Sequence, residues 1–482
     1  MTLAPSQDLR DFVKAVDGIG QLQRLQGIHW DLEIGGLLEI LLERQRHPPA
    51  FLFEDIPESR RSMRILCAQL DTIERLALAM GTQPQIGIRD FIEGWRRKLR
   101  GLDPIEPELV PSGPIFENSA EKDIDLTSFP IPRWHELDGG RYIGTGDLVV
   151  TQDPEEGWTN AGTYRVMVHG PDMLGLYISP GKHALIHREK WFARGKPCPV
   201  IISFGHHPVL FIAACTDVPI RVSEFAYAGA VLGQPIQLIR GPRTSLPFPA
   251  YSEIAIEGEM IPGDLRPEGP FGEWPGYYAS DRRPEPVVRV KALYYRNDPV
   301  LCGEAPLRPS ANQGFHLSVL RAALIWNALE EAGVPDVKGV WLHPAAFRFL
   351  VMVAIHQRYP GHARQAAVIA SQCRAGAYLG RYVIVVDDDI DIYNTDDLIW
   401  ALATRSDPAS SIEIIRRAWS GPLDPIIPQA EKGFSSRALI DATRPYEWRD
   451  EFPAVNAVSP ALKEELTRKH ATLLSRLLSR RS

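Results

Sequence analysis

Residues 146–180 read GDLVVTQDPEEGWTNAGTYRVMVHGPDMLGLYISP, a stretch in which short apolar runs alternate with glycine, proline and acidic residues. The apolar runs have the composition and length of β-strands, and turn-forming residues separate them. Runs of this kind occur at 146–152, 164–170, 174–180, 199–205, 208–215, 253–260 and 286–295. Many short strands with turn signals between them are typical of a β-barrel or a sandwich. The sequence therefore predicts a β domain over residues 116–305.

The segments before and after this region have helical periodicity. Upstream, apolar residues at helical spacing predict a strand at 50–56 and helices over 9–26, 33–46, 62–80 and 89–100. Prolines at 104, 107, 111 and 114 then predict a linker or an extended segment that wraps over the surface, because proline neither donates to a ladder nor continues a helix. These patterns predict an N-terminal α/β domain over residues 1–115.

The C-terminal part alternates helices and strands again. Helical patterns cover 317–333, 362–375 and 395–404, and strand patterns cover 337–344, 347–355 and 382–389. The alternation predicts an α/β domain over residues 306–482. At its end, Ser459 and Pro460 are suited to the N-cap and first turn of an amphipathic helix, which we expect to pack on another subunit.

Composition limits the possible functions. The chain has 482 residues and a formal net charge of -7, so it offers no overall basic charge for nucleic acid or anionic membranes. It begins without a signal-peptide pattern and has no run of 18 apolar residues. Its five cysteines are widely spaced and form no CxxC pair. We therefore expect a cytoplasmic protein that binds neither nucleic acid nor a membrane.

Common nucleotide-binding motifs are absent. Gly144-x-Gly146 lacks the third glycine of a dinucleotide fingerprint, and the segment 175–183 is one residue too long for a Walker A loop. The acidic run at 387–391 favours a strand end and a helix cap over a cation site. His206 and His207 would point to opposite faces of a strand, which favours ordinary packing.

The segment EGPFGE at 268–273 places two carboxylates on a loop that glycine and proline keep from being helical. Such a loop can direct Glu268 and Glu273 into one cavity, where one carboxyl stays ionised beside a cation and the other holds a proton. A glycine-rich hairpin with solvated glutamates is the alternative. Arg165, in WTNAGTYR at 158–165, is a permanent cation that could hold one of these carboxylates, or a surface arginine on a strand.

Taken together, these motifs resemble the UbiD-type decarboxylases, which use prenylated flavin mononucleotide and include ferulic acid and aryl-acid decarboxylases. The resemblance is carried, in the family's order, by WTNAGTYR (158–165), SPGKH (179–183), VSEFAYAGA (222–230), EGPFGEWPGYY (268–278) and VVDDDIDIYNTDDLIWALATR (385–405). It is strongest from about residue 110 to 445. It implies a central split β-barrel like that of flavin reductases, between two α/β domains, the last of which ends in an oligomerisation helix.

The resemblance also implies site residues. Arg165, Glu268 and Glu273 match the family's catalytic network, with Glu273 as the proton donor that replaces CO₂. Asn160, His183 and Glu224 match the ligands of a divalent metal, Mn²⁺ or Mg²⁺, which lies with K⁺ beside the flavin phosphate. Further cofactor-binding positions are Trp158, Thr163, Tyr164, Lys182 and Arg381. Substrate contacts are expected from Lys182, Asn312, His316 and Leu423; for Asn312 and His316 the alternative is that they cap the helix that follows.

The function implied is reversible decarboxylation of an aromatic, heteroaromatic or α,β-unsaturated acid by a dimer or hexamer, with a flavin prenyltransferase supplying the cofactor. A flavin-dependent oxidoreductase on the same barrel and a catalytically silent flavin-binding partner subunit are the alternatives. Lys182 departs from the ferulic-type enzymes, in which an uncharged residue precedes the ligand histidine. If its side chain faces inward, it would favour a more polar or phenolic acid.

Overall fold

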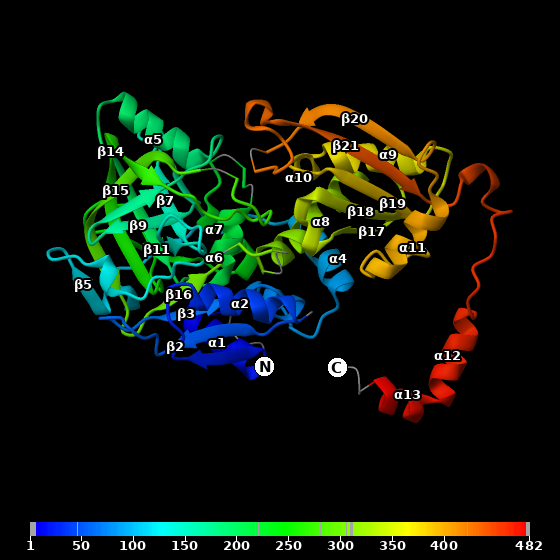
Figure 1. Ribbon diagram of the computed structural model, residues 1–482, viewed down its shortest axis with the longest axis horizontal. Coiled ribbons are helices and arrows are strands. Elements are labelled where there is room, and N and C mark those ends of the chain that lie inside the picture. The colour runs from blue at the N-terminus through cyan, green and yellow to red at the C-terminus, as the bar shows by residue number, and fades with distance from the viewer. Residues whose placement is uncertain are drawn as a thin grey trace.

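The computed structural model describes residues 6–478 except Arg46, Asp217, Ile220, Ser280, Ala305, 309–311 and Pro422. Figure 1 shows the central strands on the left, the C-terminal strands and helices on the right, and the N-terminal elements below the central strands. The predicted fold class, a mixed α/β chain with a central β domain between two α/β parts, is confirmed. Among the described residues, no helix is both long and apolar enough to cross a membrane.

The N-terminal part combines helices with a sheet whose strand order is β1-β2-β3-β16. The last of these strands, β16 (Val300–Gly303), comes from the end of the central region and pairs in parallel with β3. The elements are α1 (Leu9–Gly18), β1 (Leu22–Gln26), α2 (Glu33–Glu43), β2 (Ala50–Glu54), β3 (Arg64–Cys67), α3 (Ile73–Ala79) and α4 (Ile88–Leu99).

Two helical predictions in this part are wrong over some of their length. The helix expected over 9–26 ends at Gly18 and is followed by β1, and the helix expected over 62–80 contains β3 before α3 begins. The physical reason is tertiary pairing: β3 lies between β2 and β16, and Ile65, Leu66 and Cys67 are buried there. Ladder hydrogen bonds on both sides outweigh a local helical pattern in so short a segment.

The central part is built on a sheet with the order β6-β9-β10-β15-β14-β11-β7-β8, and β5 also pairs with β15. A smaller sheet, β13-β12-β4, includes residues of the proline-rich segment. The strands are β4 (Glu108–Leu109), β5 (Asn118–Ala120), β6 (Arg141–Gly144), β7 (Leu148–Gln152), β8 (Thr159–Gly162), β9 (Val166–Gly170), β10 (Met173–Leu176), β11 (Cys198–Phe204), β12 (Gln237–Arg240), β13 (Pro247–Pro249), β14 (Ile254–Glu268) and β15 (Arg283–Tyr295).

Three α-helices accompany this part among the described residues, namely α5 (His183–Ala193), α6 (Pro208–Cys215) and α7 (Glu224–Leu232). The prediction of a strand at 208–215 is wrong, because this run is α6. His207 accepts a hydrogen bond from the backbone N–H of Val209, and Pro208 occupies the first turn, so both residues favour a helix start. Helices α6 and α7 lie between the central strands and the C-terminal part (Figure 1).

The C-terminal part has a sheet with the order β17-β18-β19-β21-β20, in which β18, β19 and β21 are parallel. Its elements are α8 (Asn312–Glu331), β17 (Val337–Leu342), η3 (Pro344–Phe349), β18 (Leu350–Ile355), α9 (His362–Gln372), α10 (Arg374–Ala377), β19 (Tyr382–Asp387), α11 (Thr395–Arg405), β20 (Ile412–Trp419), β21 (Phe434–Ala442), α12 (Pro460–Lys469) and α13 (Ala471–Leu478).

The acidic run after β19 is structural, in line with the sequence interpretation. Asp387 and Asp389 both form ion pairs with Arg405 at the end of α11, and Asn394 caps the start of that helix. Ser459 accepts a hydrogen bond from the backbone N–H of Leu462, as expected for the N-cap of α12. Helices α12 and α13 stand away from the rest of the molecule (Figure 1).

Candidate active site

The loop after β14 is held in place by close backbone contacts. Glu268, the last residue of β14, pairs with Arg283 on β15, and the backbone N–H of Gly139 donates to the Pro270 carbonyl at 2.8 Å. A Cβ atom on Gly139 would lie 2.0 Å from the Gly269 carbonyl oxygen, so glycine is needed for this approach. The Phe271 ring packs on Tyr142 with 4.1 Å between ring centroids. The loop is therefore positioned by the strands beside it.

Arg165 lies between the two glutamates of this loop. Its Nε and Nη2 donate to Oε1 and Oε2 of Glu268 at 2.9 and 2.7 Å. Its Nη1 donates to Oε1 of Glu273 at 2.8 Å. The structure thus brings together the three residues that the resemblance of the sequence motifs assigned to a catalytic network.

The two glutamates share the arginine unequally. Glu268 is fully buried, receives both prongs of the guanidinium, and accepts a further hydrogen bond from the Tyr142 hydroxyl at 3.0 Å. Glu273 receives one prong and keeps 15% of its side chain exposed. A two-pronged, charge-assisted contact stabilises the carboxylate form, so Glu268 forms the ion pair with Arg165.

The remaining glutamate is suited to carrying a proton. Burial raises the pKa of Glu273 to about 7, the charge of Glu268 raises it as well, and Arg165 opposes both effects. A carboxyl with a pKa near neutrality can exchange its proton during a reaction at physiological pH. The arrangement therefore places one fixed ion pair and one carboxyl that can exchange a proton on the same arginine.

Both Arg165 and Glu273 line a cavity of about 810 Å³. Ligand pockets in proteins usually measure about 300–1,000 Å³, so this cavity can hold a cofactor together with a small substrate. Its wall includes residues of the central part, such as Asn160 and Lys182, and residues of the C-terminal part, such as Arg348 and Tyr378. The cavity thus lies where these two parts meet.

The three predicted metal ligands all line this cavity, although they come from separate elements. Asn160 is in β8, His183 begins α5, and Glu224 begins α7. Oε2 of Glu224 accepts a hydrogen bond from the backbone N–H of Ala161 at 2.9 Å, and burial raises the pKa of Glu224 to about 7. Nδ2 of buried Asn160 has no hydrogen-bond partner among the described residues.

These residues fit a divalent cation of the hard type. A cation beside Glu224 would offset the effect of burial by stabilising its charged form. Imidazole, carboxylate and amide oxygen suit Mn²⁺ or Mg²⁺. Among the residues that the structure describes, no three His, Cys, Asp or Glu side chains gather as a metal site, so this candidate depends on an asparagine.

Other predicted residues are divided between the cavity wall and its surroundings. Thr163, Tyr164 and Lys182 line the cavity, as do His316 of α8 and Leu423, which follows β20. Burial lowers the pKa of His316 to about 3, so its ring is neutral, and neither ring nitrogen has a hydrogen-bond partner among the described residues. A neutral imidazole can donate through one nitrogen and accept through the other.

Four predicted residues are not placed in this wall by the structure. One of them is Glu268, which instead holds Arg165 through two hydrogen bonds. Trp158 packs edge-on against His183, with 4.9 Å between ring centroids, and is not among the lining residues. Arg381 forms an ion pair with Asp424 and likewise does not line the cavity. Asn312 begins α8, and its side chain lies outside the described residues.

Sequence reasoning missed several residues of the wall. Arg348 and Tyr378 belong to the C-terminal part, and Glu304 directly follows β16. Glu304 is 1% exposed, and burial raises its pKa well above the usual range of a glutamate. None of these residues lies in a recognisable local motif. The sequence shows an acidic residue directly after a short apolar strand, but the burial of this residue is known only once the strands are placed.

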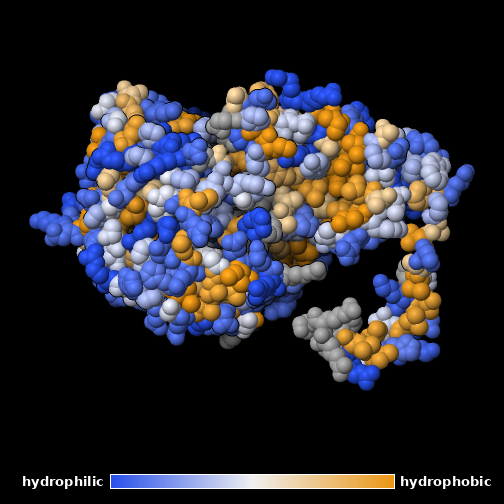
Figure 2. Space-filling view, viewed as in Figure 1, coloured by the Kyte–Doolittle hydropathy of each residue, from blue (hydrophilic) through white to orange (hydrophobic). Residues whose placement is uncertain are grey.

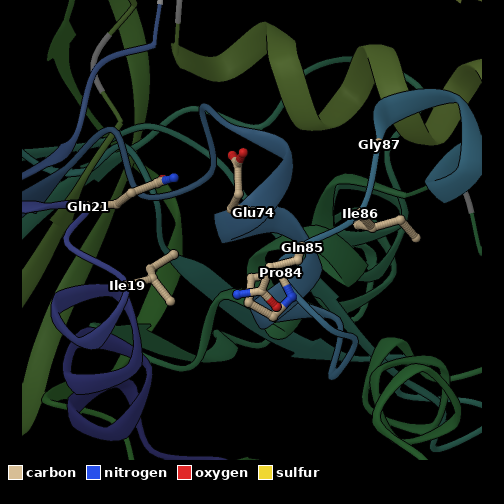
Figure 3. A pocket seen from close by; sticks show the side chains of 7 residues that line it. All are labelled: Ile19, Gln21, Glu74, Pro84, Gln85, Ile86 and Gly87. Atoms are coloured by element: carbon tan, nitrogen blue, oxygen red, sulfur yellow. The ribbon is translucent and has the colours of Figure 1, made fainter. Parts of the chain in front are cut away.

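A second cavity, of about 380 Å³, lies in the N-terminal part. Figure 3 shows Ile19 and Gln21 on the left of this cavity, Glu74 above its centre with the carboxylate pointing upward, and residues 84–87 at the centre and right. It shares no lining residue with the large cavity, and Glu74 is the one acidic side chain among the residues labelled in Figure 3. It offers no pair of groups for acid–base chemistry, so the large cavity is the candidate active site.

Comparison with known proteins identifies the class. Family models of 3-octaprenyl-4-hydroxybenzoate carboxy-lyase match in three consecutive blocks. These are the N-terminal domain at residues 13–95, the Rift-related domain at 108–309 and the C-terminal domain at 315–442. The chain therefore belongs to the UbiD family of carboxy-lyases, as the sequence motifs predicted.

Relatives and solved structures agree over nearly the whole chain. Pyrrole-2-carboxylic acid decarboxylase of Pseudomonas aeruginosa is 32% identical, covering 93% of this chain and 94% of the relative. Phenolic acid decarboxylase of Bacillus subtilis is 29% identical, covering 91% and 93%. The structure of the UbiD-class enzyme HmfF from Pelotomaculum thermopropionicum, in complex with FMN, has a TM-score of 0.84 at 29% identity, covering 95% and 98%. The open form of vanillic acid decarboxylase from Sedimentibacter hydroxybenzoicus, with truncated ShVdcD, has a TM-score of 0.86 at 27% identity, covering 98% and 99%.

Proposed function

We propose that this chain reversibly decarboxylates an aromatic, heteroaromatic or α,β-unsaturated carboxylic acid with prenylated FMN as cofactor. The observation that carries the proposal is the Glu268–Arg165–Glu273 network, whose members Arg165 and Glu273 line a cavity large enough for a flavin and a substrate. Two curated relatives named for pyrrole-2-carboxylic and phenolic acid decarboxylation support the substrate class. An evolved dimeric form of HmfF in complex with prFMN supports the cofactor.

The reaction needs one proton for each CO₂ released. The bond between the carboxylate and its carbon breaks, CO₂ leaves, and the electron pair that stays behind must be stabilised until that carbon is protonated. Prenylated FMN, when bound, would supply the electron sink for this pair. Glu273 then donates its proton to the carbon, and its new negative charge is stabilised by Nη1 of Arg165.

Arg165 and Glu268 act through Glu273 in this proposal. The buried ion pair keeps the guanidinium in one orientation, with its third nitrogen directed at Glu273. The charge of Glu268 prevents Arg165 from fully ionising Glu273, because one guanidinium must balance two carboxylates. Glu268 is therefore a positioning residue, and Glu273 is the catalytic acid.

Asn160, His183 and Glu224 would hold a Mn²⁺ or Mg²⁺ ion, accompanied by K⁺, next to the flavin phosphate. The hard donor set and the burial of Glu224 support this assignment. Bound cations can replace a glycine-rich loop as the partner of a phosphate, because they supply the largest local charge. Lys182, also in the cavity wall, adds a positive side chain beside His183.

A homo-oligomer is part of the proposal. Helices α12 and α13 stand away from the body and carry apolar residues on their surface, as Figures 1 and 2 show. Leu462, Leu466, Leu473 and Leu477 are 38–49% exposed. Four large apolar side chains on a projecting pair of helices are expected to be covered by another subunit.

The experiment that tests this function starts with protein co-produced with a flavin prenyltransferase in the presence of Mn²⁺ and K⁺. The cofactor released from it is identified by UV-visible spectroscopy and mass analysis, and CO₂ release is measured with a panel of aryl, heteroaryl and acrylic acids. We expect near-stoichiometric prenylated FMN and CO₂ release from at least one acid. Ordinary flavin alone would favour an oxidoreductase, and a folded protein without flavin would favour a silent partner subunit.

A further inference from the structure

A separate cavity of about 420 Å³ adjoins the large cavity at the loop that carries Glu273. The two cavities share Gly272, Glu273 and Pro306 as lining residues. These residues therefore form a wall with one space on each side. The catalytic acid of the proposed reaction is a member of that wall, although cofactor and substrate would occupy the large cavity alone.

The cavity of about 420 Å³ opens toward solvent and has polar groups around it. Its lining includes Leu137 and Tyr277, which are 68% and 59% exposed. Glu39, His135 and Arg308 are further lining residues. A water molecule in a protein cavity needs about two to four polar partners, and these side chains can supply them. Water can therefore reach the Glu273 side of this cavity from the bulk solvent.

The carboxyl of Glu273 has one oxygen committed and one available for the proton. Its Oε1 accepts the hydrogen bond from Arg165 at 2.8 Å, so the proton is carried by Oε2. Its backbone is fixed in a tight turn, where Glu273 N–H donates to the Tyr277 carbonyl at 2.9 Å and Gly276 N–H donates to the Glu273 carbonyl at 2.8 Å. The turn holds the residue in the wall while its side chain exchanges a proton.

Each turnover leaves Glu273 without its proton. The substrate carboxylate departs as CO₂, the new C–H bond takes the proton of Glu273, and Glu273 becomes a carboxylate. A proton from solvent must restore the acid before the next turnover. While cofactor and substrate occupy the large cavity, they stand between Glu273 and solvent on that side.

We propose that the cavity of about 420 Å³ is the water path through which the Glu273 carboxyl recovers its proton after each turnover. This inference rests on the proposed function, because it requires Glu273 to be the proton donor. A water molecule in the path gives its proton to Glu273 and is itself reprotonated by the bulk solvent, so the net reaction still consumes one solvent proton per CO₂.

The test is to fill this cavity from a position that tolerates a side chain. Gly36 lies on the exposed face of α2 and lines the cavity, and a Cβ atom there would meet nothing within 4 Å. Gly36→Phe therefore places a ring in the path without a clash at the backbone. Gly94 on α4 is the matched control, since it is also exposed, helical and free of neighbours within 4 Å of a Cβ, but lines neither cavity.

Product formation by the holoenzyme is followed after rapid mixing with a substrate of the wild type. In Gly36→Phe we expect the first turnover at the wild-type rate, because Glu273 starts protonated, followed by a steady state slower by about tenfold. Gly94→Phe should show no such burst. When enzyme in H₂O is mixed with substrate in D₂O, the first product of Gly36→Phe should retain more protium than that of the wild type.

The possible results separate this inference from the proposed function. If Gly36→Phe and Gly94→Phe have the same burst and the same isotope content, the cavity is not the path. An equal loss in the first turnover and in the steady state of Gly36→Phe would also overturn the inference, because it would indicate a disturbed loop rather than slow reprotonation. If the wild type releases no CO₂ from any acid, the proposed function fails instead.

Discussion

Replacing Glu268 by glutamine tests how the network sets the acidity of Glu273. Glutamine keeps the size of the side chain and an oxygen that can accept from Arg165, but it removes the charge that shares the arginine. Two carboxylates on one guanidinium lie roughly 6 Å apart, and at an effective dielectric constant of about 20 their repulsion is ~3 kcal/mol, or ~2 pKa units. The pKa of Glu273, which burial raises to about 7, should therefore fall in Glu268→Gln.

The sign of the pH effect follows from the role of the acid. A proton donor is active when protonated, so decarboxylation is retained at pH values below the pKa of Glu273 and lost as the pH rises through it. In Glu268→Gln this alkaline limb should move down by ~2 pH units, and the rate near pH 7.5 should drop by about 10- to 100-fold. At low pH the variant should recover a larger share of the wild-type rate.

The assay is the pH dependence of kcat, measured by CO₂ release with cofactor content matched between proteins. Glu259→Gln serves as the control, because Glu259 lies on the same strand, pairs with Lys291 at 2.7 Å and keeps 30% of its side chain exposed. Its pH profile should match that of the wild type. An unchanged alkaline limb in Glu268→Gln, with the cofactor bound, would refute the proposed division of charge between the two glutamates.

Three further predictions concern the metal, the substrate and the core. Glu224→Gln removes the one carboxylate of the predicted metal set, so each subunit should retain less Mn²⁺, measured by elemental analysis, and less flavin, measured by absorbance. Full retention of both would contradict the ligand assignment. Lys182→Gln should keep the cofactor but change the ranking of acids in a substrate screen, and an identical ranking would place its side chain outside the substrate contacts. Phe53→Ala should lower the free energy of unfolding, measured by urea titration, by about 3–5 kcal/mol because Phe53 is fully buried. Ile40→Ala, at a position 48% exposed, should lower it far less, and equal losses would contradict the placement of β2 in the core.

The comparison between sequence and structure is most informative for short apolar segments. The run at 208–215 is apolar throughout, so it has neither the alternation of a strand nor the stripe of a surface helix, and periodicity cannot assign it. Its helical state follows from the cap of His207 and from burial on all sides. Strand β3 is set by pairing with β16, about 235 residues later in the chain, and no local pattern contains that information.

The candidate site divides in a similar way. Glu268 and Glu273 stand in one short motif, so their chemistry could be considered from sequence before the structure was known. Arg165 belongs to another motif, and its contact with both glutamates is a result of the fold. Glu304 and Arg348 had no motif at all, and they enter the cavity wall because the central and C-terminal parts meet there. Resemblance to a family supplied the grouping that spacing alone could not.

The proposed function depends on Glu273 delivering the proton that replaces CO₂. The most direct measurement is the turnover of Glu273→Gln loaded with the same amount of prenylated FMN as the wild type. We expect this variant to bind the cofactor but to form no sustained product, because glutamine keeps the shape of the side chain and has no acidic proton. Turnover at the wild-type rate in the loaded variant would contradict it.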